Sequence, residues 1–237
     1  MNDERPELKA LVESVELRHR DTTETREIEW QGYRLRVLPG VFDPEYSNIG
    51  DLLSRHMRVS PGARVLDLGT GSGIQALVAA RQASSVVAID LQADAAACAR
   101  ENVQRLGLAH KIEVRQGDLF EPLHEAELFD AIVFNFPFVP WEPQTAWQRA
   151  NFDPGHRLLR RFFAEVGDHL APGGEITMTW SDIGDTELFL ALARENGLEC
   201  ATRIERSSAN VNHYIFVLRL VDDTAPSAAT SKEPESC

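Results

Sequence analysis

From Ala63 onward, short apolar runs alternate with segments whose apolar residues recur every three or four positions. The apolar runs predict strands, and the periodic segments predict helices. The predicted strands are Arg64–Leu68, Ser85–Asp90, Lys111–Arg115, Asp130–Phe134, Glu175–Trp180, Glu199–Glu205 and His213–Leu220. The predicted helices are Gly73–Arg81, Ala93–Leu106, Leu158–Leu170 and Thr186–Glu195. This alternation predicts an α/β fold in which a mostly parallel, seven-stranded sheet carries helices on both faces.

The last two predicted strands have no helical segment between them, so we expect an antiparallel strand at the end of the sheet. The beginning of the chain follows a different pattern. Apolar residues at helical spacing predict a helix from Glu7 to Arg18. Two short alternating segments, Arg26–Trp30 and Tyr33–Val37, are separated by Gln31-Gly32 and predict a hairpin. A loop then leads to a predicted helix at Ile49–Met57.

These patterns divide the chain into three regions. Residues 1–60 are expected to form an N-terminal lid of helix and hairpin, and residues 61–221 the main α/β domain. Residues 222–237 are small, polar and proline-containing, which predicts a disordered tail. No run of about 18 apolar residues is present, and the first ten residues are polar and acidic. We therefore expect a cytoplasmic protein that does not enter a membrane.

The formal net charge of −13 bears on the class of substrate. Nucleic-acid binding draws most of its affinity from Lys and Arg side chains that face phosphates. Four basic residues do cluster, at His156, Arg157, Arg160 and Arg161, but the simpler interpretation is the solvated side of an amphipathic helix. The balance of charge therefore disfavours a nucleic-acid substrate.

A glycine-rich turn, Gly69-Thr70-Gly71-Ser72-Gly73, stands between the first strand of the main domain and the helix after it. Glycines allow a tight turn and a close approach of the backbone to a ligand. The helix N-terminus beyond them offers unpaired N–H groups. Ile74 stands where a dinucleotide-binding fingerprint would have its third glycine, so the turn does not match that fingerprint.

Acidic residues near the ends of three successive strands further restrict the class of ligand that the turn could bind. Asp67 lies just before the turn, where it would repel a pyrophosphate and favour a ligand that carries an ammonium and a sulfonium. Asp90 ends the next strand, where a carboxylate can accept hydrogen bonds from both ribose hydroxyls. Asp118 follows the third strand and can accept from the exocyclic amine of adenine, with Leu119 and Phe120 beside the ring.

On these residues the chain, from about Gly40 to Leu220, resembles class I methyltransferases, which have a Rossmann-like fold and bind S-adenosylmethionine (SAM). The resemblance implies SAM as the cofactor. The cofactor-binding residues that we expect are Tyr46, Asp67, Gly69, Thr70, Gly71, Gly73, Asp90, Leu91, Asp118, Leu119 and Asn135. The seven His and three Cys residues show no spacing typical of metal ligands, and we expect no metal site.

The segment Asn135-Phe136-Pro137-Phe138 ends the fourth strand of the main domain. It resembles the Asn-Pro-Pro-Tyr/Phe motif of enzymes that methylate planar nitrogen, including the release-factor glutamine methyltransferases of the methyltransferase small group. The resemblance implies that Asn135 and a neighbouring main-chain carbonyl accept the N–H groups of the acceptor, while Phe138 stacks on it. Phe136 departs from the motif's first proline and alters the carbonyl beside the acceptor nitrogen. We take Asn135, Phe136 and Phe138 as the candidate catalytic residues.

A long connection follows this motif and is rich in aromatic residues. Trp141, Trp147 and Phe152, with Tyr46 from the N-terminal region, are consistent with the roof of a small substrate pocket. Large aromatics of this kind are equally consistent with a homodimer contact.

The leading hypothesis is methyl transfer from SAM to a nitrogen of a small molecule or of a protein side chain. One alternative keeps the fold but changes the reaction, closing a ring within SAM and releasing methylthioadenosine. Two further alternatives are an rRNA base methyltransferase and a non-catalytic SAM-binding partner subunit. Methylthioadenosine formed from SAM alone would favour the first alternative, and tight SAM binding without any turnover would favour the last.

Overall fold

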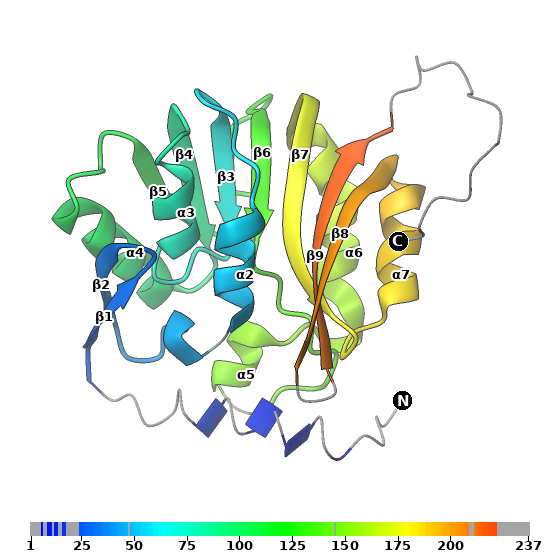
Figure 1. Ribbon diagram of the computed structural model, residues 1–237, viewed down its shortest axis with the longest axis horizontal. Helices are drawn as coiled ribbons and strands as arrows, with labels where there is room; N and C mark the ends of the chain where they lie inside the picture. The colour runs from blue at the N-terminus through cyan, green and yellow to red at the C-terminus, as the bar shows by residue number, and fades with distance from the viewer. Residues whose placement is uncertain are drawn as a thin grey trace.

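The computed structural model describes residues 6, 9–10, 12–13, 16–17, 24–46, 48–144, 146–208 and 211–221. Its main feature is a seven-stranded sheet with the order β5-β4-β3-β6-β7-β9-β8 (Figure 1). The strands are β3 (Arg64–Leu68), β4 (Ser85–Asp90), β5 (Ile112–Gln116), β6 (Phe129–Phe134), β7 (Leu170–Ser181), β8 (Leu198–Ser208) and β9 (Val211–Leu220). β3 and β4 have the predicted bounds, and the others differ by a few residues.

The direction of the last strand was predicted, but its position was not. β3, β4, β5, β6 and β7 pair in parallel, whereas β9 is antiparallel to both β7 and β8. The expected antiparallel last strand is thus confirmed as β9, which lies inside the sheet beside β7, while β8 forms the edge. The connection through α7 (Thr186–Glu195) passes over one strand position, and β9 turns back into that position beside β7.

Helices cover both faces of the sheet. α2 (Asn48–His56), α3 (Ile74–Ala79) and α4 (Ala93–Arg105) pack on one face, and α6 (Arg157–Val166) and α7 on the other. In Figure 1, α2 and α3 lie in front of the sheet and α6 behind it. Alternate residues of β3 enter the two cores, Val65 on the α3 side and Leu66 and Leu68 on the α6 side. Both faces of the strand are buried, which explains its nearly continuous apolar run.

The N-terminal hairpin has the predicted bounds, β1 (Arg26–Trp30) and β2 (Tyr33–Val37). Gln31 and Gly32 both have positive φ, at 51° and 79°. Two such residues match the type I′ turn that suits two-residue hairpins. Asn102 of α4 fixes the hairpin to the main domain, because its side chain accepts from Arg36 N at 2.8 Å and donates to Arg36 O at 2.7 Å.

The predicted helices outside the sheet core agree with the structure only in part. The described residues between Pro6 and Leu17 are helical, and the rest of the predicted helix 7–18 lies outside the described residues, as does the tail 222–237. The predicted helix 158–170 ends early, because a 3₁₀ turn at Gly167–His169 precedes β7. A short helix that was not predicted, α5 (Ala146–Asn151), lies at the end of the sheet toward which β3 and β6 point (Figure 1). None of the described helices is long and apolar enough to cross a membrane.

The packing of α2 on the sheet leads to a test of how the N-terminal region is attached. Leu53 is 0% exposed and belongs to the core that also holds β3, α3 and α4. We expect Leu53→Ala to lower the free energy of global unfolding by about 2–5 kcal/mol, measured by urea denaturation. Arg55→Ala on the same helix, whose side chain is 66% exposed, should cost less than about 1 kcal/mol. Equal effects of the two changes would show that α2 does not share the core.

Candidate active site

The glycine-rich turn joins β3 to α3 at the carboxyl end of the sheet. Gly69, Gly71 and Gly73 have φ values of 62°, 56° and 87°, which side chains disfavour. A Cβ at Gly71 would meet no atom within 4 Å, because that glycine faces open space. A Cβ at Gly73 would lie 3.3 Å from Ala99 of α4. Gly71 therefore opens the turn toward a ligand, whereas Gly73 lets α3 approach α4 closely.

The amides of this turn are already bonded within the protein. Thr70 N donates to Ile89 O at 3.0 Å, and Gly71 N donates to the Asp90 carboxylate at 2.9 Å. Gly73 N donates to Thr70 O at 2.8 Å. A pyrophosphate site would need such N–H groups to face the ligand. These three amides are therefore not free to bind the pyrophosphate of a dinucleotide, in agreement with the missing third glycine.

Asp67 lies beneath the turn and organises it. One carboxylate oxygen accepts from the Thr70 hydroxyl at 2.7 Å and from Ala76 N of α3 at 3.0 Å. The side chain is 1% exposed, and the other oxygen has no hydrogen-bond partner among the described residues. Burial raises the pKa of Asp67 to about 7. Asp67 is absent from the residues that line the cavity, so its visible role is to hold the turn against α3.

Asp90 ends β4 and faces the same cavity. Its carboxylate accepts from Gly71 N and from Gln92 N, both at 2.9 Å. Burial raises the pKa of Asp90 above its ordinary value. Leu91, next along the chain, also lines the cavity and is 58% exposed, one of the few large apolar side chains so exposed. Together they present a hydrogen-bond acceptor beside an apolar surface, which suits a nucleoside.

The loop after β5 supplies the next two candidates. Asp118 lines the cavity and pairs with Arg161 of α6 at 2.8 Å. Leu119 lines it too and has φ of 46°, a conformation that costs energy in a leucine. Phe120 does not reach the cavity; it stacks on His169 with ring centroids 4.8 Å apart. The expectation that Phe120 borders the ligand therefore finds no counterpart in the cavity wall.

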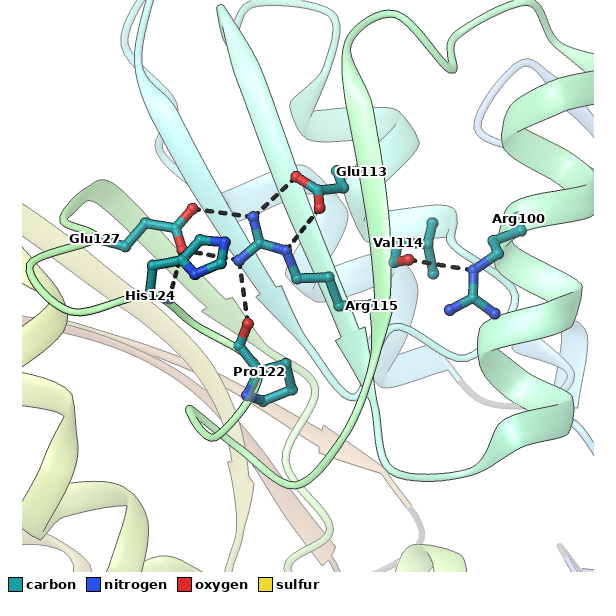
Figure 2. A network of polar contacts seen from close by, with 7 residues as sticks. All are labelled: Arg100, Glu113, Val114, Arg115, Pro122, His124 and Glu127. Carbon is teal, nitrogen blue, oxygen red and sulfur yellow. Dashed lines mark hydrogen bonds and ion pairs between the residues drawn. The ribbon is translucent and has the colours of Figure 1, made fainter.

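A cluster of charged side chains anchors this loop at its far end (Figure 2). Arg115 of β5 forms two hydrogen bonds with Glu113 and two with Glu127, at 2.8–3.2 Å, and also donates to Pro122 O. His124 N donates to Glu127 as well. These bonds hold the pKa of Glu127 below its ordinary value. Arg115 therefore ties the middle of the loop, at Pro122, and its far end, at Glu127, to β5.

The end of β6 carries the candidate catalytic segment, and β7 stabilises it. Phe136 N donates to the Thr179 hydroxyl at 2.8 Å, and that hydroxyl is 3.1 Å from Asn135 Oδ1, to which it donates. A proline at position 136 would have no N–H to satisfy. Thr179 is fully buried, so it both provides a partner for the N–H that Phe136 introduces and fixes the orientation of the Asn135 amide. Nothing in the sequence singles out Thr179.

One cavity of about 780 Å³ joins these elements. The predicted residues that line it are Tyr46, Gly69, Thr70, Gly71, Asp90, Leu91, Asp118, Leu119, Asn135, Phe136 and Phe138. Asp67 and Gly73 lie behind its wall. Trp147 and Phe152 line it from the connection after β6, and this placement favours the pocket interpretation of those aromatics. Arg206 and His213 of the β8–β9 hairpin also line it and were not predicted.

The residues present fit SAM. Asp90 and Asp118 place acceptors where ribose and adenine donors would need them, and the open face of Gly71 leaves room beside them. Three amides of the turn, those of Thr70, Gly71 and Gly73, already have partners within the protein and are not available to a pyrophosphate. In the part of the chain that the structure describes, no cluster of His, Cys, Asp or Glu could hold a metal ion.

Comparisons with known proteins show methyltransferases among the relatives of this chain. The chain is 32% identical over 204 residues to the release factor glutamine methyltransferase of Gloeobacter violaceus, covering 78% of this chain and 70% of that protein. It is 52% identical over 116 residues to the ribosomal protein L11 methyltransferase of Desulfitobacterium hafniense, covering 48% and 33%. A methyltransferase structure from Pyrococcus furiosus superposes with a TM-score of 0.62 at 16% identity, covering 90% and 98%.

The sheet order, the turn and the cavity define a SAM-dependent class I methyltransferase. Residues 32–195 match the model of the methyltransferase small domain, and the chain belongs to that family.

The buried Asp67 leads to a prediction about pH. Its pKa in the folded protein is about 7, well above the ordinary value near 4, so the folded state retains a proton that the unfolded chain releases. Its stabilising contribution is present below about pH 4 and is lost as pH rises toward 7, by roughly 1 kcal/mol per unit. Urea denaturation at about pH 5 and about pH 8 should show wild type losing stability relative to Asp67→Asn. A stability difference that stays constant with pH would contradict the prediction.

The bridge through Thr179 leads to a second prediction. Thr179→Val keeps the shape of the side chain but leaves the buried Phe136 N–H without a partner and frees the Asn135 amide. We expect a loss of about 1–3 kcal/mol in the free energy of unfolding. Thr179→Ser keeps the hydroxyl and serves as the matched control, with a smaller loss. If the valine and serine variants were equally stable, the hydrogen bonds of the bridge would not matter.

Proposed function

We propose that this methyltransferase transfers a methyl group from SAM to a nitrogen of a small molecule or a protein side chain that binds beside Asn135. The observation that carries the proposal is the continuity of the cavity. It extends from Asp90 and Asp118 at one end to Asn135 and Phe138 at the other. A cofactor at the first end and an acceptor at the second would therefore meet within one enclosure.

At the cofactor end, the chain supplies acceptors and apolar surface. Asp90 would accept from the ribose hydroxyls, Asp118 would accept from the adenine amine, and Leu91 and Leu119 would cover the ring. When bound, SAM supplies a methyl group already activated by the sulfonium, so the protein need not provide a strong base. Asp118 forms an ion pair with Arg161 and at the same time lines the cavity.

At the acceptor end, the protein would orient a weak nucleophile. The lone pair of an amide or aromatic amine is delocalised, so its direction matters. Asn135 Oδ1 and the main-chain carbonyl of Phe136 can each accept one N–H of the acceptor, and Phe138 can stack on its plane. The Thr179 hydroxyl holds Asn135 in place beforehand. Well-aligned reactants gain on the order of 7–11 kcal/mol over free ones.

The kinds of acceptor follow from the relatives and from the departure at Phe136. Relatives are named for the methylation of release factor and ribosomal proteins, which supports a protein side chain. Phe136 in place of proline changes the shape of the site beside the acceptor nitrogen. For this reason a small molecule is proposed as an acceptor alongside a protein side chain. The acidic chain continues to disfavour nucleic acid. A cytoplasmic location and a homodimer stay predictions.

The N-terminal region takes part in the proposal as a lid. Val12, Phe42, Tyr46 and Ile49 line the same cavity, although they precede the main domain in sequence. A cover of this kind would exclude water while the acceptor is bound.

The test is methyl transfer by an Asn135 variant. Wild type, Asn135→Ala and the control Asn196→Ala, at an exposed position beyond α7, are assayed for S-adenosylhomocysteine with glutamine-containing peptides and free amino acids. We expect Asn135→Ala to lower kcat by about 100-fold or more and the control to leave it unchanged, because orientation is lost. Full turnover by Asn135→Ala would remove the proposed role. Methylthioadenosine formed from SAM alone would replace methyl transfer with ring closure.

A further inference from the structure

The β8–β9 hairpin contributes two polar side chains to the acceptor end of the cavity. Arg206 of β8 and His213 of β9 are cross-strand partners, so they lie on one face of the sheet. Ser181 of β7 pairs with His213 in the same row. Thr179 pairs with Ile215 in the neighbouring row of that face. Arg206 and His213 therefore stand one row of side chains beyond the residue that orients Asn135.

The charges along the cavity are segregated. Three acidic residues line it, Asp90, Asp94 and Asp118, and all belong to the cofactor end. Among the described residues that line the cavity, Arg206 is the one side chain with a permanent positive charge. No ion pair or hydrogen bond of its guanidinium is present among the described residues, and it is exposed to solvent. In a chain of net charge −13, an unneutralised arginine beside the acceptor is available to an anion.

His213 also lines the acceptor end of the cavity, as a neutral side chain. Its Nδ1 is buried and has no hydrogen-bond partner in the described residues. Burial lowers the pKa of His213, with Arg206 acting in the same direction and Asp182 opposing, so the ring is neutral near pH 7. The ring also lies against Phe138, with centroids 6.2 Å apart. His213 therefore adds a neutral ring, and no second positive charge, to this end of the cavity.

We propose that the methyl acceptor carries a carboxylate, which pairs with Arg206 while its nitrogen lies beside Asn135 and its flat part against Phe138. This inference rests on the proposed function and names its class of substrate. Guanidinium and carboxylate match in a two-pronged geometry. An uncharged acceptor of the same shape would leave Arg206 without a partner. The charge of the acceptor is therefore a selection criterion of this enzyme.

Two probes of equal shape test the charge preference. Hippurate and hippuramide share an aromatic ring and an amide nitrogen and differ in a carboxylate against a neutral amide. Their binding to the full chain is measured by calorimetry with saturating S-adenosylhomocysteine. We expect hippurate to bind at least about tenfold tighter, a preference that weakens with added salt. Arg206→Gln should bring the two affinities together, whereas Arg206→Lys should keep part of the preference.

The control is Arg194→Gln, which removes the same charge at an exposed position on α7. It should leave the preference for hippurate unchanged. Equal affinities in wild type, an unchanged preference in Arg206→Gln, or failure of both probes to bind would overturn the proposal. Inorganic phosphate displacing hippurate at equal concentration would overturn the assignment of a carboxylate. Binding of S-adenosylhomocysteine is titrated in parallel, because its loss would instead contradict the proposed function.

Discussion

The site depends on one buried contact, between the Asp67 carboxylate, the Thr70 hydroxyl and the first turn of α3. A carboxylate held in a 1% exposed position costs free energy, as its raised pKa shows. In return, the turn that begins at Gly69 has one shape, with its amides directed back into the protein. That shape leaves Asp90 on the cavity wall and uses three of the amides that a pyrophosphate could otherwise bind. Asp67, which lies beneath the turn, therefore influences which class of ligand can bind, because it fixes the shape of the turn.

At the acceptor end, the buried Thr179 hydroxyl likewise fixes the local shape of the chain. Phe136 brings an N–H into a position where the family motif has proline, and Thr179 of the neighbouring strand accepts it. The same hydroxyl then fixes Asn135. The departure from the motif is therefore compensated locally, and the orienting amide is retained. This explains how the carbonyl beside the acceptor can change shape without loss of the group that aligns the nitrogen.

The sequence predicted those parts of the fold that local pattern determines. The hairpin, β3, β4 and α7 have the expected bounds, because alternation, turn residues and caps are local signals. The position of β9 inside the sheet was missed, since strand order depends on how a hairpin packs against β7. Asp118 and Asn135, which line the cavity, were predicted from their places at strand ends. Thr179 was not, because its importance comes from a neighbour 43 residues away.

The same limit explains why Arg206 and His213 were missed. In sequence they are an unremarked arginine and histidine in two terminal strands, and only the antiparallel register places them side by side. β8 and β9 bring them to the cavity, on the side away from Asp90. The two ends of the cavity consequently differ in charge because different parts of the chain build them. The acidic residues Asp90 and Asp118, which we propose bind the cofactor, come from the α/β core, and Arg206, which we propose binds the acceptor, comes from β8. Specificity for the acceptor can therefore change through the hairpin while the cofactor end stays the same.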